Sequence, residues 1–180
     1  DITHLKGTAL KDAYGKLQMV FQNPVGSFDP RRTLGDGIGE SLRNQGIPKA
    51  EIRKKVSELL EQCGLDASYA DRYPHQVSGG QCQRAAIARA LTVDPKVLIC
   101  DEATSALDVT VQKRIIELLR RLKEEKNLSY LFICHNLALV QEFCDRVLVM
   151  KDGQIVEEGT PDDVICNPQD EYTKMLVEAV

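Results

Sequence analysis

The stretch from Val97 to Asp108 constrains the fold of this chain more than any other. Its first four residues, Val97 to Cys100, are apolar and have the length of a strand that is buried on both faces. Asp101 and Glu102 follow directly. Two charges at the end of a buried strand are costly unless a cation or a reacting group binds there. Because ligands of open α/β sheets bind beyond the carboxyl ends of the strands, a ligand site is expected at this acidic pair.

Two interpretations of the acidic pair are open at this point. In the first, one carboxylate holds a hydrated Mg²⁺ ion and the other acts on a water molecule. In the second, the strand simply runs into an acidic loop, or the acids begin the next helix and favour its positive end.

Apolar runs of strand length alternate with stretches of helical periodicity, which predicts an α/β fold with a mainly parallel sheet. Strands are expected at 17–21, 97–100, 131–134 and 147–150, the last forming a hairpin through Asp152-Gly153 into 154–157. Helices are expected at about 48–63, 77–91, 110–125 and 137–143, with short ones starting near 161 and 170. No convincing strand lies between 30 and 90, so this part is predicted to be a helical subdomain inserted into the core.

Composition limits the class of protein. The chain has 180 residues, of which 43% are hydrophobic and 28% charged, and its net charge of −4 argues against a nucleic-acid-binding role. No apolar run approaches the roughly 18 to 20 residues of a membrane span, and the first residues do not resemble a signal peptide. The six cysteines are scattered without a Cys-x-x-Cys pair, which favours a reduced, cytosolic setting over a structural zinc site.

The segment Ser78-Gly79-Gly80-Gln81 predicts the start of a helix that could bind an anion. Two residues without a β-carbon let backbone amides approach an anion closely, and the positive end of the helix dipole lies at the same place. Ser78 adds a hydroxyl donor. The alternative is a glycine-rich helix start that Ser78 merely caps.

Two further polar residues follow strand-like runs. His135 comes after the run at 131–134, and Gln22 after the run at 17–21. If these strands end at the same sheet edge, His135 and Glu102 would lie within reach of one ligand. The alternatives are a structural histidine and an ordinary polar loop residue.

In combination and in this order, these features resemble the ATP-binding subunits of ABC transporters, and the resemblance covers nearly the whole chain. Gln22 matches the Q-loop glutamine of that family, and Val77 to Gln81 match its signature motif, usually Leu-Ser-Gly-Gly-Gln. Val97 to Asp101 match the Walker B strand, and Glu102 matches the catalytic glutamate.

Two more matches lie downstream. Ser105-Ala106-Leu107-Asp108 is similar to the D-loop, and His135 is similar to the switch histidine. The fold that the resemblance implies is a partial P-loop ATPase core with an inserted helical subdomain. Residues 1–29 would form the part of the core that ends in the Q-loop, and residues 30–92 the helical subdomain with the signature motif. Residues 93–160 would return to the core, and residues 161–180 would begin a C-terminal extension.

The resemblance implies an ATPase that uses ATP and Mg²⁺. Asp101 would hold Mg²⁺ through water, and Glu102 would polarise the attacking water as general base. Gln22 would sense Mg²⁺ and the γ-phosphate, and its loop would signal to the membrane subunits. His135 would contact the γ-phosphate.

The resemblance also implies a site shared between two subunits. Ser78, the amides of Gly79 and Gly80, and Gln81 of the same motif would grip the γ-phosphate of ATP bound to the opposite subunit, and Asp108 would act across that interface. The partners would be a second ATP-binding subunit in a homo- or heterodimer, transmembrane permeases and, indirectly, an extracytoplasmic substrate-binding protein. No nucleic acid is expected, and the location would be peripheral, on the cytoplasmic face of the membrane.

A closer resemblance is to the oligopeptide/dipeptide importer branch, which implies peptide uptake, with nickel as another possible cargo. It is carried by the long segment Gln22–Arg32, by Arg72–Gln76 before the signature, and by Asn167–Lys174. The chain departs from the family in four places that remove no reacting group. Val77 stands where the family usually has leucine, and Cys82 where it often has a basic or polar residue. Ala103 replaces the common proline, and Asn136 replaces the usual aspartate.

A phosphate-binding loop of the form Gly-x-x-x-x-Gly-Lys-[Ser/Thr] is absent from these residues, since Gly15-Lys16 is followed by Leu17. In the family this loop precedes the Q-loop. We therefore expect the chain to be a fragment that by itself binds ATP poorly and hydrolyses almost none. Two alternatives stay open: a soluble, non-transport ABC ATPase, which usually carries long charged or coiled-coil insertions, and a non-catalytic interaction module.

Overall fold

The structure is a computed structural model that describes residues 1–105 and 107–179. The chain divides into two compact units, Asp1–Ile133 and Cys134–Val180, and each is described by itself. The predicted boundaries after residues 29, 92 and 160 are not tested by this division and stay predictions.

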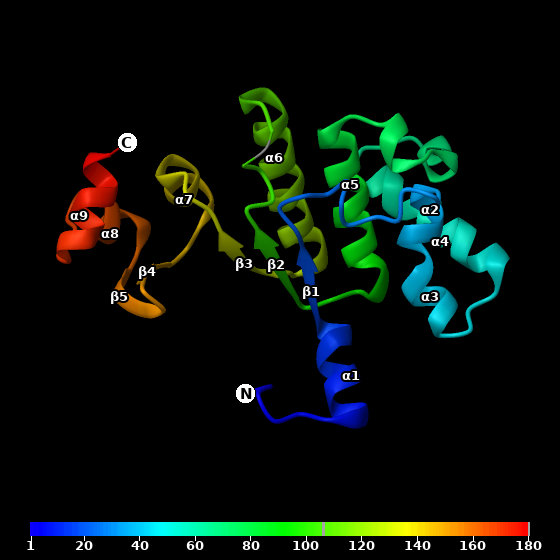
Figure 1. The fold of residues 1–180 in the computed structure, drawn as a ribbon, viewed down its shortest axis with the longest axis horizontal. Coiled ribbons are helices and arrows are strands. Elements are labelled where there is room, and N and C mark those ends of the chain that lie inside the picture. Colours follow the sequence, from blue (N-terminus) through cyan, green and yellow to red (C-terminus); the bar gives the residue numbers. More distant parts are fainter. Residues whose placement is uncertain (106, 180) are drawn as a thin grey trace. The chain divides into compact units, whose positions relative to one another are not determined.

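A parallel sheet forms the centre of the first unit (Figure 1). Its three strands lie in the order β1 (Leu17–Val20), β2 (Val97–Asp101), β3 (Ser129–Ile133). In the register of the sheet, Val20 pairs with Cys100, and Cys100 pairs with Phe132. The carboxyl ends of all three strands therefore meet at one edge. This confirms the predicted α/β class with a parallel sheet.

Burial alternates along β2 instead of covering both faces. Leu98 and Cys100 are fully buried, whereas Val97, Ile99 and Asp101 are partly exposed. The expectation of a strand buried on both faces is therefore wrong for the described residues. On the buried side, helix α6 (Val109–Lys126) contributes a stripe of buried side chains and is held to β3 by the Tyr130 hydroxyl, which donates to the carbonyl of Leu119 at 3.0 Å.

The chain between β1 and β2 is helical, as predicted, and Figure 1 shows these helices gathered beyond β1. They are α2 (Leu34–Ile38), α3 (Glu40–Asn44), α4 (Lys49–Gln62), η1 (Ala67–Asp71), η2 (Pro74–Gln76), α5 (Gly79–Ala90) and η3 (Leu91–Val93). The predicted apolar face of α4 is buried at Ile52, Val56, Leu59 and Leu60. Gly64 follows with φ +71°, a left-handed conformation that ends the helix without a β-carbon penalty.

Helix α1 (Gly7–Lys16) precedes the sheet and was not predicted from the sequence. None of its residues is buried.

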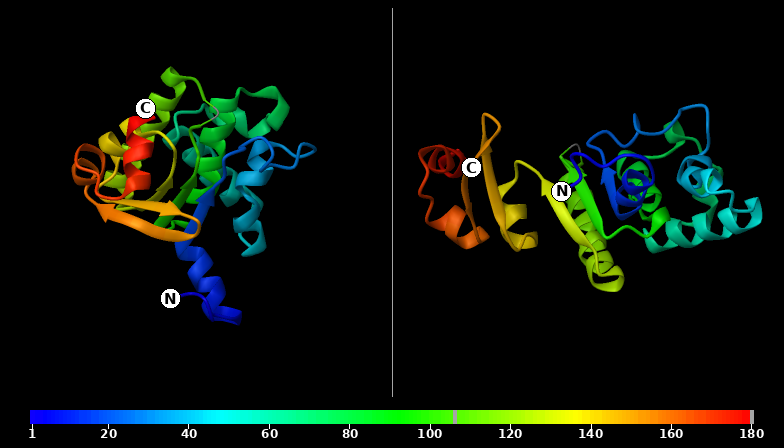
Figure 2. Two further views of the ribbon diagram at one scale, coloured as in Figure 1. Left: turned by 60° about the vertical axis from the view of Figure 1, so that its left-hand side comes forward. Right: turned by 90° about the horizontal axis from the view of Figure 1, so that it is seen from below.

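The second unit contains α7 (Leu137–Phe143), β4 (Val147–Lys151), β5 (Gln154–Gly159), α8 (Pro161–Cys166) and α9 (Glu171–Glu178). The antiparallel β4–β5 hairpin is drawn in orange in Figure 2. Its turn residues, Asp152 and Gly153, both have positive φ (+50° and +77°), as a two-residue hairpin turn requires, and this confirms the predicted hairpin. None of the helices in the described part of the chain is both long and apolar enough to cross a membrane.

Candidate active site

The parallel register brings Gln22 and Glu102 together at the carboxyl edge of the sheet. Nε2 of Gln22 donates a hydrogen bond of 2.5 Å to Oε2 of Glu102. The two residues follow β1 and β2, whose ends are level in the sheet. A hydrogen bond to a charged acceptor is short and strong, so this contact holds the carboxylate in one orientation.

Glu102 has an unusual backbone conformation. Its φ is +44°, in the left-handed region that costs a residue with a β-carbon about 1–2 kcal/mol. Three hydrogen bonds maintain this conformation. The amide of Glu102 donates to the carbonyl of Ile133 at 2.9 Å, and its carbonyl accepts from the amide and the hydroxyl of Ser105 at 3.1 and 3.0 Å. Backbone strain of this kind is concentrated at functional sites.

Asp101 is the last residue of β2 and is only partly buried. Alternation along the strand places its side chain on the face that carries Ile99, opposite the buried face of Cys100. Burial raises the pKa of the Cys100 thiol to about 12, so the residue before the acidic pair stays neutral near pH 7. The carboxylates of Asp101 and Glu102 and the amide oxygen of Gln22 are the hard oxygen donors that Mg²⁺ prefers. No group of three or more His, Cys, Asp or Glu that could hold a metal occurs among the residues that the structure describes.

The signature segment forms a reciprocal cap at the start of α5. Oγ of Ser78 accepts from the amide of Gln81 at 3.3 Å, and the amide of Ser78 donates to Oε1 of Gln81 at 2.9 Å. This pattern is a capping box. Nε2 of Gln81 donates to the Tyr69 hydroxyl at 2.8 Å, which fixes the start of the helix to η1.

The two glycines of this segment have different surroundings. Both lie in the first turn of α5, where backbone amides have no acceptor within the helix. Gly80 is buried, and a β-carbon placed on it would lie only 2.4 Å from Cγ1 of Val111 in α6. Gly79 is exposed, and a β-carbon on it would have only an ordinary contact, 3.8 Å from Cδ2 of Leu107. Packing therefore requires a glycine at position 80 but not at 79.

The predicted D-loop includes Ala106, which lies outside the described residues. Asp108, its last residue, is the N-cap of α6, where Oδ1 accepts from the amide of Val111 at 3.0 Å. Asp108 therefore has a structural task in its own chain in addition to the predicted role across a subunit interface.

His135 belongs to the second unit, two residues after the end of β3, so its predicted approach to the ligand of Glu102 stays a prediction. Cys134 lies outside β3, which is one residue shorter at this end than expected. Asn136 is the N-cap of α7, with Oδ1 accepting from the amide of Leu139 at 3.2 Å. Capping gives a local reason for a small polar residue at this position.

Two residues that contact the predicted site were missed by the sequence argument. Tyr69 holds Gln81, and Arg89 in α5 binds the loop that follows Gln22. Arg89 had one sequence signal, because it is the single charge among the small and apolar residues 85–91. Tyr69 had none, since 12 residues separate it from Gln81.

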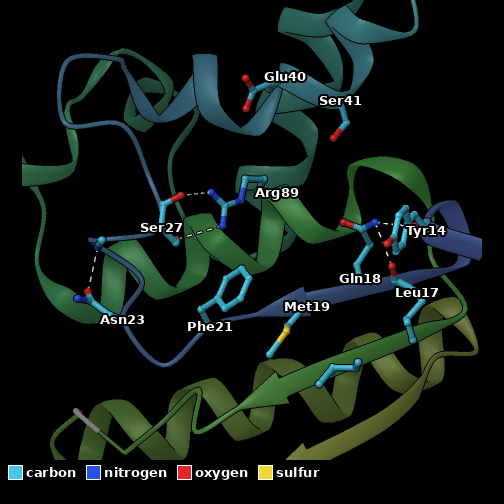
Figure 3. A pocket seen from close by; sticks show the side chains of 12 residues that line it. Tyr14, Leu17, Gln18, Met19, Phe21, Asn23, Ser27, Glu40, Ser41 and Arg89 are labelled. Carbon is cyan, nitrogen blue, oxygen red and sulfur yellow. Dashed lines mark hydrogen bonds between the residues drawn. The ribbon is translucent and has the colours of Figure 1, made fainter. Parts of the chain in front are cut away.

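A pocket of about 820 Å³ opens beside β1 (Figure 3). The predicted reacting residues Gln22, Asp101 and Glu102 do not line it. The residues that do come from α1, β1, the following loop, α3, α5 and β2, and they are Tyr14, Leu17, Gln18, Met19, Phe21, Asn23, Gly26, Ser27, Glu40, Ser41, Arg89 and Ile99.

A family model described as ABC transporter matches residues 1–105. The chain is 44% identical over 182 residues to the oligopeptide transport ATP-binding protein OppF of Salmonella typhimurium, covering 100% of this chain and 54% of that protein. It is 46% identical over 165 residues to the dipeptide transport ATP-binding protein DppF of Haemophilus influenzae, covering 91% of this chain and 50% of that protein. The chain thus spans about half the length of the curated relatives it matches.

Among solved structures, similarity extends to the dimeric post-hydrolysis state of the ATP-binding cassette MJ0796 bound to ADP and Pi. The TM-score is 0.76 and the identity 31%, covering 88% of this chain and 68% of that one.

Proposed function

This chain belongs to the ABC transporter family, and we propose that it is part of an ATP-hydrolysing subunit that powers peptide uptake across the cytoplasmic membrane. Its relatives OppF and DppF are named as ATP-binding proteins of oligopeptide and dipeptide transport. Their names support a peptide as the cargo.

The observation that carries the proposal is the hydrogen bond from Gln22 to Glu102 at the edge of the sheet. In the proposed reaction, Glu102 accepts a proton from the water that attacks the γ-phosphate of ATP. Gln22 orients this carboxylate, and Asp101 and Gln22 offer oxygen donors to Mg²⁺, which would supply positive charge to the phosphates. His135 completes the set by contacting the γ-phosphate.

The signature segment supplies the second half of the proposed site, in a dimer of ATP-binding subunits. The Ser78 hydroxyl and the amides of Gly79 and Gly80 meet the γ-phosphate of ATP held by the other subunit, because an anion is stabilised at a helix N-terminus. Gln81 keeps Ser78 in place through the capping box. Asp108 acts across the same interface.

Transport requires further partners in this proposal. The ATPase dimer lies peripherally on the cytoplasmic face, bound to transmembrane permeases, and a substrate-binding protein outside the membrane delivers the peptide to them. ATP hydrolysis then drives the conformational change of the permeases that moves the peptide across the membrane.

The test uses the complete subunit that contains this chain, assembled with its permeases in lipid vesicles. We expect Mg²⁺-dependent ATP hydrolysis that is coupled to uptake of labelled peptides. Glu102→Gln should lower turnover by about 10²- to 10⁴-fold, the range that a general base contributes, while ATP still binds. Glu51→Gln, the same change at an exposed position in the first turn of α4, is the matched control. Normal hydrolysis by Glu102→Gln would refute the assigned role, and hydrolysis without uptake would refute transport.

A further inference from the structure

Arg89 lies near the end of α5 and binds the loop that follows Gln22 (Figure 3). Its Nη1 donates to the carbonyl of Ser27 at 2.5 Å, and its Nη2 donates to Oγ of Ser27 at 3.0 Å. The centre of the guanidinium lies 4.4 Å from the centre of the Phe28 ring. Arg89 therefore engages two successive loop residues, one through hydrogen bonds and one through a cation–π contact.

The loop at 23–28 is itself compact. The amide of Gly26 donates to Oδ1 of Asn23 at 2.9 Å, and the amides of Ser27 and Phe28 donate to the carbonyls of Pro24 and Val25, both at 3.3 Å. These bonds make the loop a short, folded connection between Gln22 and the residues that Arg89 binds. The residues that link Gln22 to Ser27 are therefore held in a folded conformation.

Phe28 also ties the loop to α2. Its side chain is buried, and a β-carbon placed on Gly37 would lie 2.6 Å from Cδ1 of Phe28. The ring is therefore enclosed between the Arg89 guanidinium and the backbone of α2.

Burying the charge of Arg89 has a cost that the loop offsets. Burial lowers the pKa of this guanidinium, which shows that the surroundings disfavour the charged form. The carbonyl, the hydroxyl and the aromatic face that it meets are the groups that compensate. A lysine cannot reproduce this arrangement, because it lacks the planar fork of donors.

We propose that Arg89 is a positioning residue for Gln22. By fixing Ser27 and Phe28 to α5, it sets where Gln22 lies against Glu102 and connects that contact to the helix that Ser78 caps. The role of Gln22 in catalysis rests on the proposed function, whereas the fixing of the loop does not.

The first experiment needs no nucleotide and uses the chain itself. Hydrogen exchange of the amides of Gly26, Ser27 and Phe28 reports the order of the loop. We expect exchange about tenfold faster in Arg89→Ala and in Arg89→Lys, since hydrogen bonds to a charged group and their geometry are lost. Arg84→Ala is the matched control on the same helix, because Arg84 binds the carbonyl of Gly64 at 3.1 Å instead.

A fluorescence reporter can follow the end of β1 directly, because the chain contains no tryptophan. Phe21 is exposed and precedes Gln22, so Phe21→Trp places a single indole beside it. The emission of this tryptophan should shift in the Arg89 variants and not in Arg84→Ala. The proposal is wrong if Arg89→Lys changes neither the exchange of the wild-type chain nor the emission of the Phe21→Trp chain. The lysine variant decides the matter even if Arg89→Ala fails to fold.

The second experiment measures ATP turnover in the assembled complex. Arg89→Lys should lower kcat about tenfold with KM for ATP within about twofold, because Gln22 is displaced while the nucleotide contacts remain. Residues that act as a unit have non-additive effects, so Arg89→Lys should cause no further loss in a Gln22→Ala background. If the fold-losses of kcat caused by Arg89→Lys and Gln22→Ala multiply in the double variant, the proposal is overturned. Absence of turnover in wild type would refute the proposed function and leave the loop measurements to decide on Arg89.

Discussion

Nε2 of Gln22 lies 2.5 Å from Oε2 of Glu102, although 80 residues separate them in the chain. The parallel pairing of β1 with β2 brings the two residues together, since Val20, the last residue of β1, pairs with Cys100, the penultimate residue of β2.

Gln22→Ala should lower ATP turnover of the complete subunit by about 10- to 100-fold, the usual cost of losing a group that orients a reacting residue. Stability should change little, because Gln22 is exposed. Gln45→Ala, at another exposed glutamine, is the control. The measurements are steady-state hydrolysis and thermal melting, and equal turnover in the two variants would contradict the role of Gln22.

Glu102→Gly should be more stable than Glu102→Ala by about 1 kcal/mol. Both variants remove the carboxylate, but only glycine adopts a φ of +44° without strain. At most positions in regular structure the order is reversed, because glycine loses more conformational entropy on folding. Urea denaturation of the two variants measures the difference, and a more stable alanine variant would show that the backbone relaxes at this position.

Gly80→Ala should destabilise the chain by about 1–3 kcal/mol, the usual cost of overpacking, because the new methyl group meets Val111. Gly79→Ala should be neutral or slightly stabilising, because its methyl group has room. The midpoints of denaturant unfolding test this difference. If Val111→Ala, which removes the opposing methyl groups, does not reduce the cost of Gly80→Ala, the steric explanation is wrong.

The thiols of Cys63 and Cys100 should make the folded chain less stable at high pH. Burial raises the pKa of each thiol from an ordinary 9.0 to about 12. The unfolded chain therefore releases these protons first as pH rises, and the stabilisation that is complete below pH 9 is lost between pH 9 and 12. At pH 10 the loss is on the order of 1 kcal/mol for each thiol.

Denaturation at pH 8 and pH 10 tests this expectation. Between pH 8 and pH 10, Cys100→Ala should lose less stability than the wild-type chain, and the difference should equal the contribution of one thiol. In the native chain at pH 8, an alkylating reagent should modify the exposed Cys166 well before Cys63 and Cys100, as mass spectrometry can show. Equal rates at the three thiols would contradict the burial described here.

The order and type of most elements could be predicted from the sequence because they depend on local patterns. The apolar stripe of α4, the glycine-opened start of α5 and the Asp152-Gly153 turn each follow from neighbouring residues. The alternation of strands and helices predicts a parallel sheet, which places Asp101, Glu102 and Gln22 at one edge. Helix α1, which buries no residue, was not predicted.

What the sequence did not reveal depends on contacts between distant segments. The hydrogen bonds of Tyr69 to Gln81 and of Arg89 to Ser27 join elements that only the folded chain brings together. The left-handed backbone of Glu102 was also not foreseen, since glutamate has no preference for that conformation. The half-exposed face of β2 likewise depends on what packs against the sheet.

The close approach of Gly80 to Val111 joins the first turns of α5 and α6, whose capping residues are Ser78 and Asp108. The side chain of Val111 fills the space that a β-carbon on Gly80 would occupy, so the two helix starts pack directly against each other. In the proposed dimer, we expect Ser78 and Asp108 to reach the second subunit together, because the helices that they cap pack against each other at Gly80 and Val111.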